Sequence, residues 1–196
     1  MSRSAAPLPS PPVEQLLHTL PEDLRTHSER VARLCAPVGV ALHLSAGDRS
    51  ALHLAALLHD VGKRHLPTEL LDKPGPLTPD EWGLMRQHPD WSVQDAQGLD
   101  LPAQVLPAVA AHHERWDGRG YPRGLRGTEI SPLACILSVC DVFDALVSVR
   151  SYKPAWSPHA AWAELRRGRE RAFCPQVLDA FLSVHAALPD LRWRPE

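Results

Sequence analysis

The stretch ALHLAALL at residues 51–58 decides the fold class, because it is apolar on nearly every side of a helix. A helix of this kind lies in the middle of a domain, where other elements surround it. Elsewhere apolar residues recur at helical spacing, and no stretch alternates as a half-buried strand does. The sequence therefore predicts helices without strands, which is an all-α domain.

The starts of the expected helices carry the usual signals. Thr78, Ser131 and Ser157 each precede a proline, which is the common order of a capping residue and a first helical residue. The predicted helices span 22–36, 48–60, 79–87, 90–98, 102–113, 132–149, 157–170 and 175–188. Residues 1–12 contain four prolines among small residues, so we interpret them as a flexible lead-in to a single domain at 13–196.

The composition excludes several classes of protein. The chain has 196 residues, enough for one domain with a sizeable core, and its net charge of −2 gives no basic field for a nucleic acid polymer or a membrane surface. The four cysteines show no CxxC spacing, which argues against a thiolate zinc site or a disulfide framework. No apolar run is long enough to span a membrane, and the start MSRSAAPLPSPP lacks the apolar core of a signal peptide. We therefore expect a cytoplasmic protein.

Histidines and aspartates gather at the ends of the apolar helices. His59 and Asp60 follow the stretch quoted first, His112 and His113 close another apolar helix, and Asp141 lies inside an apolar run. Any one of these histidines alone is better explained by packing or by solvent exposure. A buried aspartate, however, needs a cation, and the surrounding histidines indicate that the cation is a metal. Imidazole and carboxylate without thiolate favour iron or manganese over structural zinc.

Two motifs resemble the signatures of a known family. HDVGK at 59–63 and HHERWDGRGYP at 112–122 look like the two motifs of the HD-GYP family, bacterial phosphodiesterases acting on cyclic di-GMP within the HD hydrolase superfamily. The resemblance runs from about Asp23 to Leu182. It implies an HD-domain helical bundle with additional C-terminal helices. It also implies a metal-dependent phosphodiesterase that converts a cyclic dinucleotide to linear pGpG or to GMP.

The resemblance also implies a set of metal ligands. The family's first histidine lies in a His-x-x-Arg-Val pattern, here at 27–31, and another lies in a His-Pro pair, here at 88–89. Asp60 is the implied bridge between two divalent ions, with iron and manganese expected. Members with a third ion add a glutamate one turn before the first histidine, where this chain has Asp23. The implied ligands are Asp23, His27, His59, Asp60, His88, His112, His113 and Asp141.

Catalytic and substrate-binding roles carry over in the same way. The implied catalytic residues are His59, Asp60 and Lys63, and the implied substrate contacts are Lys63, Tyr121, Asp144, Arg150 and Lys153. The residues alone agree in part, because Lys63 at one helix end and Arg150 just past another place positive charge at the mouth of the site. Asp144 lies one turn after Asp141, and we expect it to orient Lys63 rather than to bind a metal.

Two alternatives stay open at this point. One is an HD hydrolase of another nucleotide, such as cyclic GMP-AMP. The other is a non-catalytic module that senses a cyclic dinucleotide, or that docks a GGDEF-type cyclase through the GYP loop. The retained ligands favour the enzyme. We expect its activating input to come from a separate protein, from oligomerisation such as a homodimer, or from substrate supply.

Overall fold

The structure is a computed structural model, and it describes residues 10–149 and 155–186. In these two ranges no strand forms, and the only bridges are isolated ones. The prediction of an all-α domain is therefore confirmed. The α-helices are α1 (Pro11–His18), α2 (Glu22–Ala41), α3 (Ala46–Leu58), α4 (Thr68–Leu71), α5 (Pro79–Met85), α6 (His88–Ala96), α7 (Val105–Ala110), α8 (Pro132–Val147), α9 (Pro158–Arg167) and α10 (Pro175–Ala186). Two short 3-10 helices are η1 (Val61–His65) and η2 (Gly127–Glu129).

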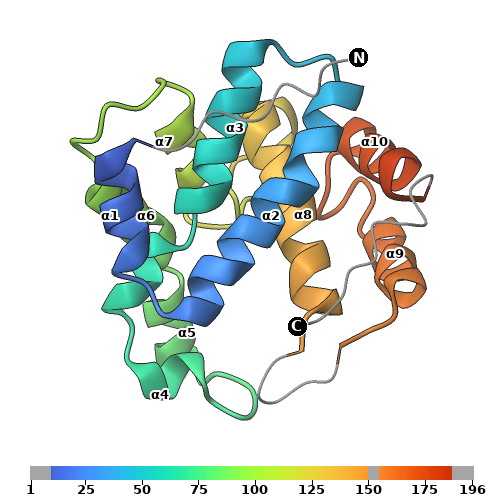
Figure 1. The fold of residues 1–196 in the computed structure, drawn as a ribbon. Helices are drawn as coiled ribbons and strands as arrows, with labels where there is room; N and C mark the ends of the chain where they lie inside the picture. Colours follow the sequence, from blue (N-terminus) through green and yellow to red (C-terminus); the bar gives the residue numbers. More distant parts are fainter. Residues whose placement is uncertain (1–9, 150–154, 187–196) are drawn as a thin grey trace.

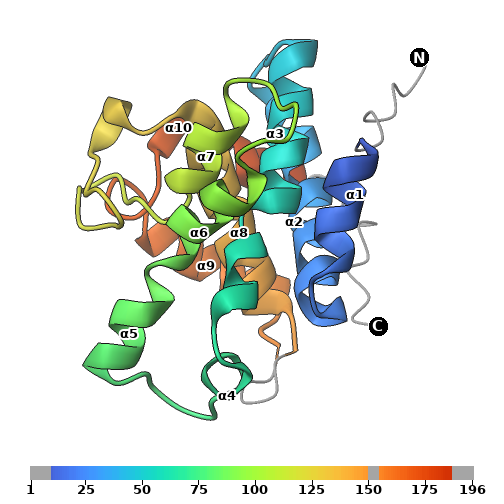
Figure 2. The ribbon, with the colours of Figure 1, turned by 90° about the vertical axis from the view of Figure 1, so that its left-hand side faces the viewer.

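Helix α3 lies in the core, as its apolar sequence predicted. Its residues Ala51, Leu52 and 55–58 are buried, and it packs against α2, α7 and α8. Helices α2, α3 and α8 cross in the middle of the molecule, with α9 and α10 on one side of them (Figure 1). Figure 2 shows α4 and α5 extending below the rest of the bundle. Helices α3 and α8, which carry or precede candidate ligands, contact each other inside the same core.

The helix starts follow the predicted cap signals. Helices α5, α8 and α9 each begin at the proline that follows Thr78, Ser131 or Ser157. Thr78 forms a full capping box with Glu81, whose carboxylate accepts from the Thr78 backbone N–H at 2.7 Å. Such caps satisfy N–H groups that the first helical turn leaves without partners.

The helix ends differ from the prediction at two places that matter for the site. The helix predicted at 48–60 ends at Leu58, so that His59 and Asp60 lie in the turn that leads into η1. The helix predicted at 102–113 is confined to Val105–Ala110, and His112 and His113 lie in the turn that follows it. Adjacent side chains diverge on a helix, and the turn allows both members of each pair to approach one site.

The N-terminal segment also differs from the prediction. Pro11 and Pro12 belong to the predicted flexible lead-in, but they form the first turn of α1, where proline is well tolerated. Val13 and Leu17 are buried in the core and hold this helix in place. Proline content alone was a misleading signal here; residues 1–9 of the predicted lead-in lie outside the described residues.

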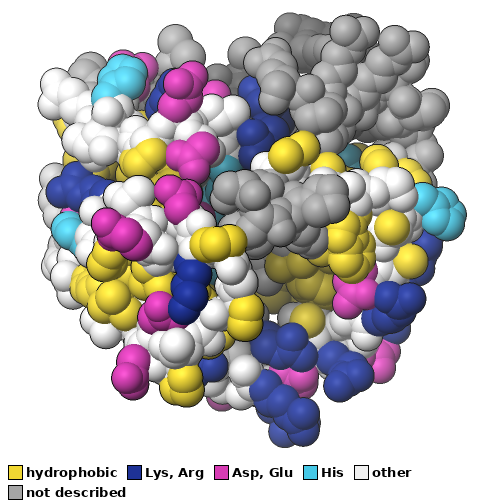
Figure 3. All heavy atoms as spheres, turned by 90° about the horizontal axis from the view of Figure 1, so that it is seen from below, with side chains coloured by type: hydrophobic (Ala, Val, Ile, Leu, Met, Phe, Trp, Pro, Cys, Tyr) yellow, Lys and Arg dark blue, Asp and Glu magenta, His cyan; other side chains and the backbone are white. Residues whose placement is uncertain are grey.

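The surface seen from below is hollowed, and lysine and arginine side chains gather along one edge of that face (Figure 3). In the described part of the chain, no helix combines the length and apolarity needed to cross a bilayer.

Candidate metal centre and active site

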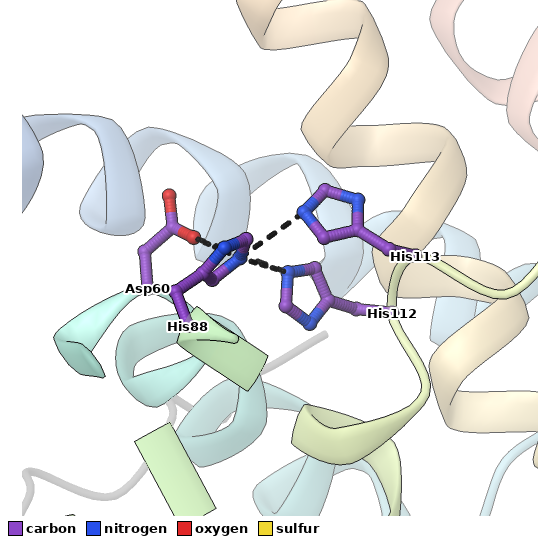
Figure 4. A group of neighbouring side chains, drawn as sticks. All are labelled: Asp60, His88, His112 and His113. Carbon is purple, nitrogen blue, oxygen red and sulfur yellow. Dashed lines mark hydrogen bonds and ion pairs between the residues drawn. The ribbon is translucent and has the colours of Figure 1, made fainter. Parts of the chain in front are cut away.

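Asp60 is the residue on which the site is built, because two groups of possible metal ligands share it. The four-residue group contains Asp60, His88, His112 and His113 (Figure 4), and the three-residue group contains His27, His59 and Asp60. In each group the ligand atoms lie within 4.8 Å of one another. Asp60 is 1% exposed. One buried carboxylate between two clusters of imidazoles is suited to bridging two adjacent ions.

Three of the histidines have their protonated nitrogen fixed by the backbone. His59, His88 and His112 each hydrogen-bond through Nδ1 to the carbonyl three residues earlier, at 2.8, 2.7 and 2.6 Å respectively. A carbonyl oxygen only accepts, so Nδ1 carries the proton and Nε2 keeps a free lone pair. This is the tautomer that binds a metal through Nε2.

The free lone pairs point at one another and at carboxylates. Nε2 of His88 lies 3.3 Å from Nε2 of His112, 3.2 Å from Nε2 of His113 and 3.3 Å from Oδ1 of Asp60 (Figure 4). Nε2 of His27, Nε2 of His59 and Oδ1 of Asp60 are buried without a hydrogen-bond partner. Acceptors that face one another away from water are unfavourable unless a cation lies between them. The donor set therefore fits divalent metal ions.

His27 is oriented by a carboxylate instead of a carbonyl. Its Nδ1 donates to Oδ2 of Asp144 at 2.7 Å, and its Nε2 lies 3.1 Å from Oδ1 of Asp141. Arg30 holds Asp144 in a two-point contact, with Nε 2.7 Å from Oδ1 and Nη2 2.9 Å from Oδ2. The same Asp141 oxygen lies 3.8 Å from Nε2 of His59. Asp141 on α8 thus adds a carboxylate oxygen close to both histidines of the three-residue group.

The electrostatics of the cluster also suit a cation. Burial would raise the pKa of Asp60 and of Asp141, but the neighbouring histidines, and Lys63 beside Asp60, hold both well below the usual range. Burial lowers the pKa of His113 to about 3 and that of His112 well below its ordinary value. The site therefore presents ionised carboxylates beside neutral imidazoles.

His27 shows the opposite behaviour. Burial alone would lower its pKa, but the close contacts with the carboxylates of Asp141 and Asp144, together with the charge of Asp60, raise it to about 9. Without a metal ion this histidine holds a proton at neutral pH. A cation and that proton would compete for the same nitrogen.

Two of the expected substrate contacts lie beside the cluster. The Lys63 ammonium is 2.6 Å from Oδ2 of Asp60, and its side chain stays partly exposed. The Tyr121 ring stacks on the His113 ring, with centroids 4.8 Å apart and planes at 27°. Arg150 and Lys153 lie outside the described residues.

Asp144 and Asp23 differ from the rest of the predicted set. Asp144 was expected to orient Lys63, but its contacts are with His27, Arg30 and Ser148, while Lys63 pairs with Asp60. Asp23 lies in the first turn of α2, one turn before His27, where it is exposed and belongs to neither ligand group.

Three supporting residues were missed by the sequence reasoning. Arg30 had a signal, since it lies one turn after His27 in the same motif. Glu114 is buried and accepts from the backbone N–H groups of residues 123 and 125, at 2.7 and 3.0 Å, which folds the GYP loop back on itself. Ser92 donates to the His59 carbonyl at 2.7 Å and accepts from the Gly62 N–H at 2.9 Å. No local pattern pointed to this role of Ser92, because its partners lie about thirty residues away in the chain.

Comparison with known proteins points to one family. A family model described as HD domain matches residues 11–177. The cyclic di-GMP phosphodiesterase response regulator RpfG of Xanthomonas campestris pv. campestris is 42% identical over 165 residues, which cover 83% of this chain and 44% of that protein. A cyclic di-GMP phosphodiesterase of Thermotoga maritima is 37% identical over 185 residues, covering 91% and 50% respectively. The 3'3'-cGAMP-specific phosphodiesterase 2 of Vibrio cholerae is 36% identical over 173 residues, covering 84% and 33%.

Solved structures share the fold. The HDG"Y"P protein Bd1817 from Bdellovibrio bacteriovorus superimposes with a TM-score of 0.69 at 24% identity, covering 83% of this chain and 52% of that one. The HD domain of the phosphodiesterase PgpH of L. monocytogenes gives 0.67 at 12% identity, covering 95% and 100%.

The paired ligand groups are compatible with divalent metal binding, and the fold is that of an HD domain. The chain belongs to the HD domain family and, within it, to the HD-GYP family. It spans half or less of the length of the curated relatives described above.

Proposed function

We propose that this chain is a metal-dependent phosphodiesterase that hydrolyses a cyclic dinucleotide, cyclic di-GMP first of all. The observation that carries the proposal is the single buried carboxylate, Asp60, shared by two groups of imidazoles whose lone pairs converge. Two adjacent cations are the arrangement used for in-line displacement at phosphorus. The names of the relatives, cyclic di-GMP phosphodiesterases and cGAMP-specific phosphodiesterases, support the substrate class.

The metals follow from the ligands. His27, His59 and Asp141 would hold one ion and His88, His112 and His113 the other, with Asp60 between them. Neutral imidazoles with carboxylates and no thiolate favour iron or manganese. When bound, such ions neutralise charge on the phosphodiester and lower the pKa of water. A third, weaker ion at Asp23 is a further part of the proposal, because Asp23 and His27 share a helix face.

The side chains of the protein have distinct tasks in this reaction. The Lys63 ammonium, next to Asp60 and partly exposed, is placed to bind a phosphoryl oxygen. Asp144 and Arg30 hold the His27 ring in its orientation, so that Nε2 faces the reacting centre. We propose Tyr121, Arg150 and Lys153 as further substrate contacts. Water adds across one phosphodiester bond, and the products are a 5′-phosphate and a free 3′-hydroxyl of a linear dinucleotide.

Cyclic GMP-AMP is the second candidate substrate. It is favoured by the similarity to a 3'3'-cGAMP-specific phosphodiesterase. The residues proposed to contact phosphate would serve either cyclic dinucleotide, so the base-reading part of the site must decide between them.

A turnover assay tests the proposed function. The chain, loaded anaerobically with Fe²⁺ or with Mn²⁺, should hydrolyse cyclic di-GMP, cyclic GMP-AMP or both to linear products. Asp60→Ala should lose metal and reduce turnover by more than about 100-fold, because even residues that only orient a ligand contribute roughly 10- to 100-fold. The matched control is Asp179→Ala, which removes an exposed carboxylate on α10 that pairs with Arg169. It should leave turnover unchanged. Metal-loaded protein that hydrolyses neither compound would overturn the proposal.

A further inference from the structure

A stack of side chains leads outward from the metal centre. Tyr121 lies on the ring of His113, and the guanidinium carbon of Arg86 lies 5.5 Å from the centroid of the Tyr121 ring. The same guanidinium carbon lies 5.9 Å from the centroid of the Trp82 ring. A cation within about 6 Å of an aromatic centroid is attracted to the ring face. The order from the centre outward is therefore His113, Tyr121, Arg86 and Trp82.

Arg86 is fixed to the site through the backbone as well. It is the C-cap residue of α5, and its N–H donates to the Trp82 carbonyl at 3.0 Å. His88, a member of the four-residue group, follows two residues later at the start of α6. The position of the guanidinium is thus tied to a metal ligand on one side and to the Tyr121 ring on the other.

The guanidinium of Arg86 has no carboxylate partner in the described residues, although its side chain is exposed. Other arginines near the cluster do have one: Arg64 lies 3.2 Å from Asp95 and Arg115 lies 2.8 Å from Asp117. A guanidinium stacked on aromatic faces keeps the N–H groups at its edge available to a ligand. Trp82 is 45% exposed, which leaves a large apolar ring face beside those donors.

A simpler explanation is that Trp82 and Arg86 form an ordinary pair four residues apart on a helix surface. The contact with Tyr121 goes beyond it, because that ring comes from a loop 35 positions further along the chain and itself stacks on a metal-cluster histidine. Surface pairing explains the contact between Trp82 and Arg86, but it does not explain why the Arg86 guanidinium lies over the Tyr121 ring.

We propose that Arg86 reads the purine base of the nucleotide, donating to O6 and N7 of guanine, and that Trp82 offers the face on which the base stacks. This inference rests on the proposed function, which places a phosphodiester at the metal centre. In a nucleotide the sugar lies between the base and the phosphate. A phosphate at the ligand cluster that contains His113 would therefore place the sugar near Tyr121 and the base near Arg86. Guanine offers two acceptors to an arginine, whereas adenine has a donor at the 6 position. Trp82 does not distinguish purines, since stacking tolerates every base.

Binding of GMP and AMP to the metal-loaded protein, measured by calorimetry, tests the inference. Arg86→Ala should weaken GMP binding by about 5- to 100-fold, the range expected for one bidentate contact, and should change AMP binding by less than about threefold. Trp82→Ala should weaken both nucleotides by similar factors of about 5-fold or more, and Trp82→Phe should restore most of the loss. Arg167→Ala, which removes an exposed guanidinium on α9, is the matched control and should change neither.

A second measurement separates this inference from the proposed function. Hydrolysis of bis(p-nitrophenyl) phosphate, which carries no base, should stay within about twofold in Arg86→Ala, and metal content should be unchanged. Equal loss of GMP and AMP binding would overturn base reading and make Arg86 a phosphate contact, and no loss of either would reduce Arg86 to a surface residue. If the wild-type chain hydrolyses no cyclic dinucleotide but binds GMP through Arg86, the proposed activity fails and the inference stands.

Discussion

Two kinds of partner orient the histidines around Asp60. His88 and His112 of the four-residue group and His59 of the three-residue group donate Nδ1–H to backbone carbonyls, whereas His27 of the three-residue group donates to the Asp144 carboxylate. The protonation preferences are opposite: the pKa of His112 is lowered and that of His27 is raised to about 9. Both rings are buried, so burial alone does not decide the protonation state. Burial is the main cause of the lowered pKa of His112, whereas at His27 the neighbouring carboxylates outweigh it.

The largest effect is expected from removing the charge behind His27. Asp144→Asn keeps an acceptor for Nδ1 but loses the negative charge, and substitutions of residues that orient a ligand typically reduce metal affinity 10- to 100-fold. We expect one metal equivalent to weaken by about that factor while the other, held by His88, His112 and His113, keeps its affinity. A metal titration followed by calorimetry measures both equivalents.

The control for this variant is Asp179→Asn, an exposed aspartate on α10 that pairs with Arg169. It should leave both equivalents unchanged. If Asp144→Asn weakens both equivalents equally, the two groups are not independent and the contrast between them is wrong.

A smaller effect should appear in the stability of the metal-free protein at different pH values. Because the folded-state pKa of His27 is raised, its contribution to stability is complete below about pH 6.5 and is lost as the pH rises toward 9. The pKa values of His112 and His113 are lowered, so above about pH 6.5 both are neutral in the folded and the unfolded chain and cost no stability. As the pH falls below that value, the unfolded chain binds protons that the folded chain excludes, and stability decreases. Stability should therefore be highest near pH 6.5.

Urea unfolding of metal-free protein between pH 4.5 and 9.5 would measure how the free energy of unfolding changes on each side of pH 6.5. We expect it to fall by roughly 1–3 kcal/mol on the acid side and on the alkaline side. Asp144→Asn should flatten the alkaline slope, because it removes part of what holds the proton on His27. Metal-loaded protein should show a flatter alkaline slope as well, because the cation replaces that proton. Stability that rises from pH 6.5 to 9 in the metal-free protein would contradict the assignment of His27.

The smallest effect concerns Asp23. Its carboxylate is exposed and one turn from His27. Aspartate is one methylene shorter than glutamate, the residue that the resemblance to the HD-GYP family implies for a third ion. We expect Asp23→Ala to remove one weak metal equivalent, and Asp23→Glu to strengthen it, while the two tight equivalents persist. A titration curve that is unchanged in both variants, with slightly lower thermal stability in Asp23→Ala, would leave Asp23 as a helix-end charge.

The sequence was sufficient to predict that the candidate ligands in short motifs lie together. His59 with Asp60, and His112 with His113, are neighbours in the chain, and their residue types already indicate metal binding. The partners that orient them depend on tertiary packing: Asp144 meets His27 across 117 positions, so that spacing along α8 suggested a wrong neighbour, Lys63. The stack that includes Arg86 is equally non-local. Helix α1 was missed for another reason, since four prolines resemble a linker until the buried side chains of Val13 and Leu17 are seen.

The hydroxyl of Ser92 has a consequence for how quickly ions can enter the protein. By bonding to both His59 and Gly62, it ties α6 to the turn that carries Asp60, and His88 lies on that same helix. The entropy of bringing these two segments together is therefore lost when the chain folds. We expect an arriving ion to find Asp60 and His88 already side by side, so that its binding does not have to order this part of the polypeptide.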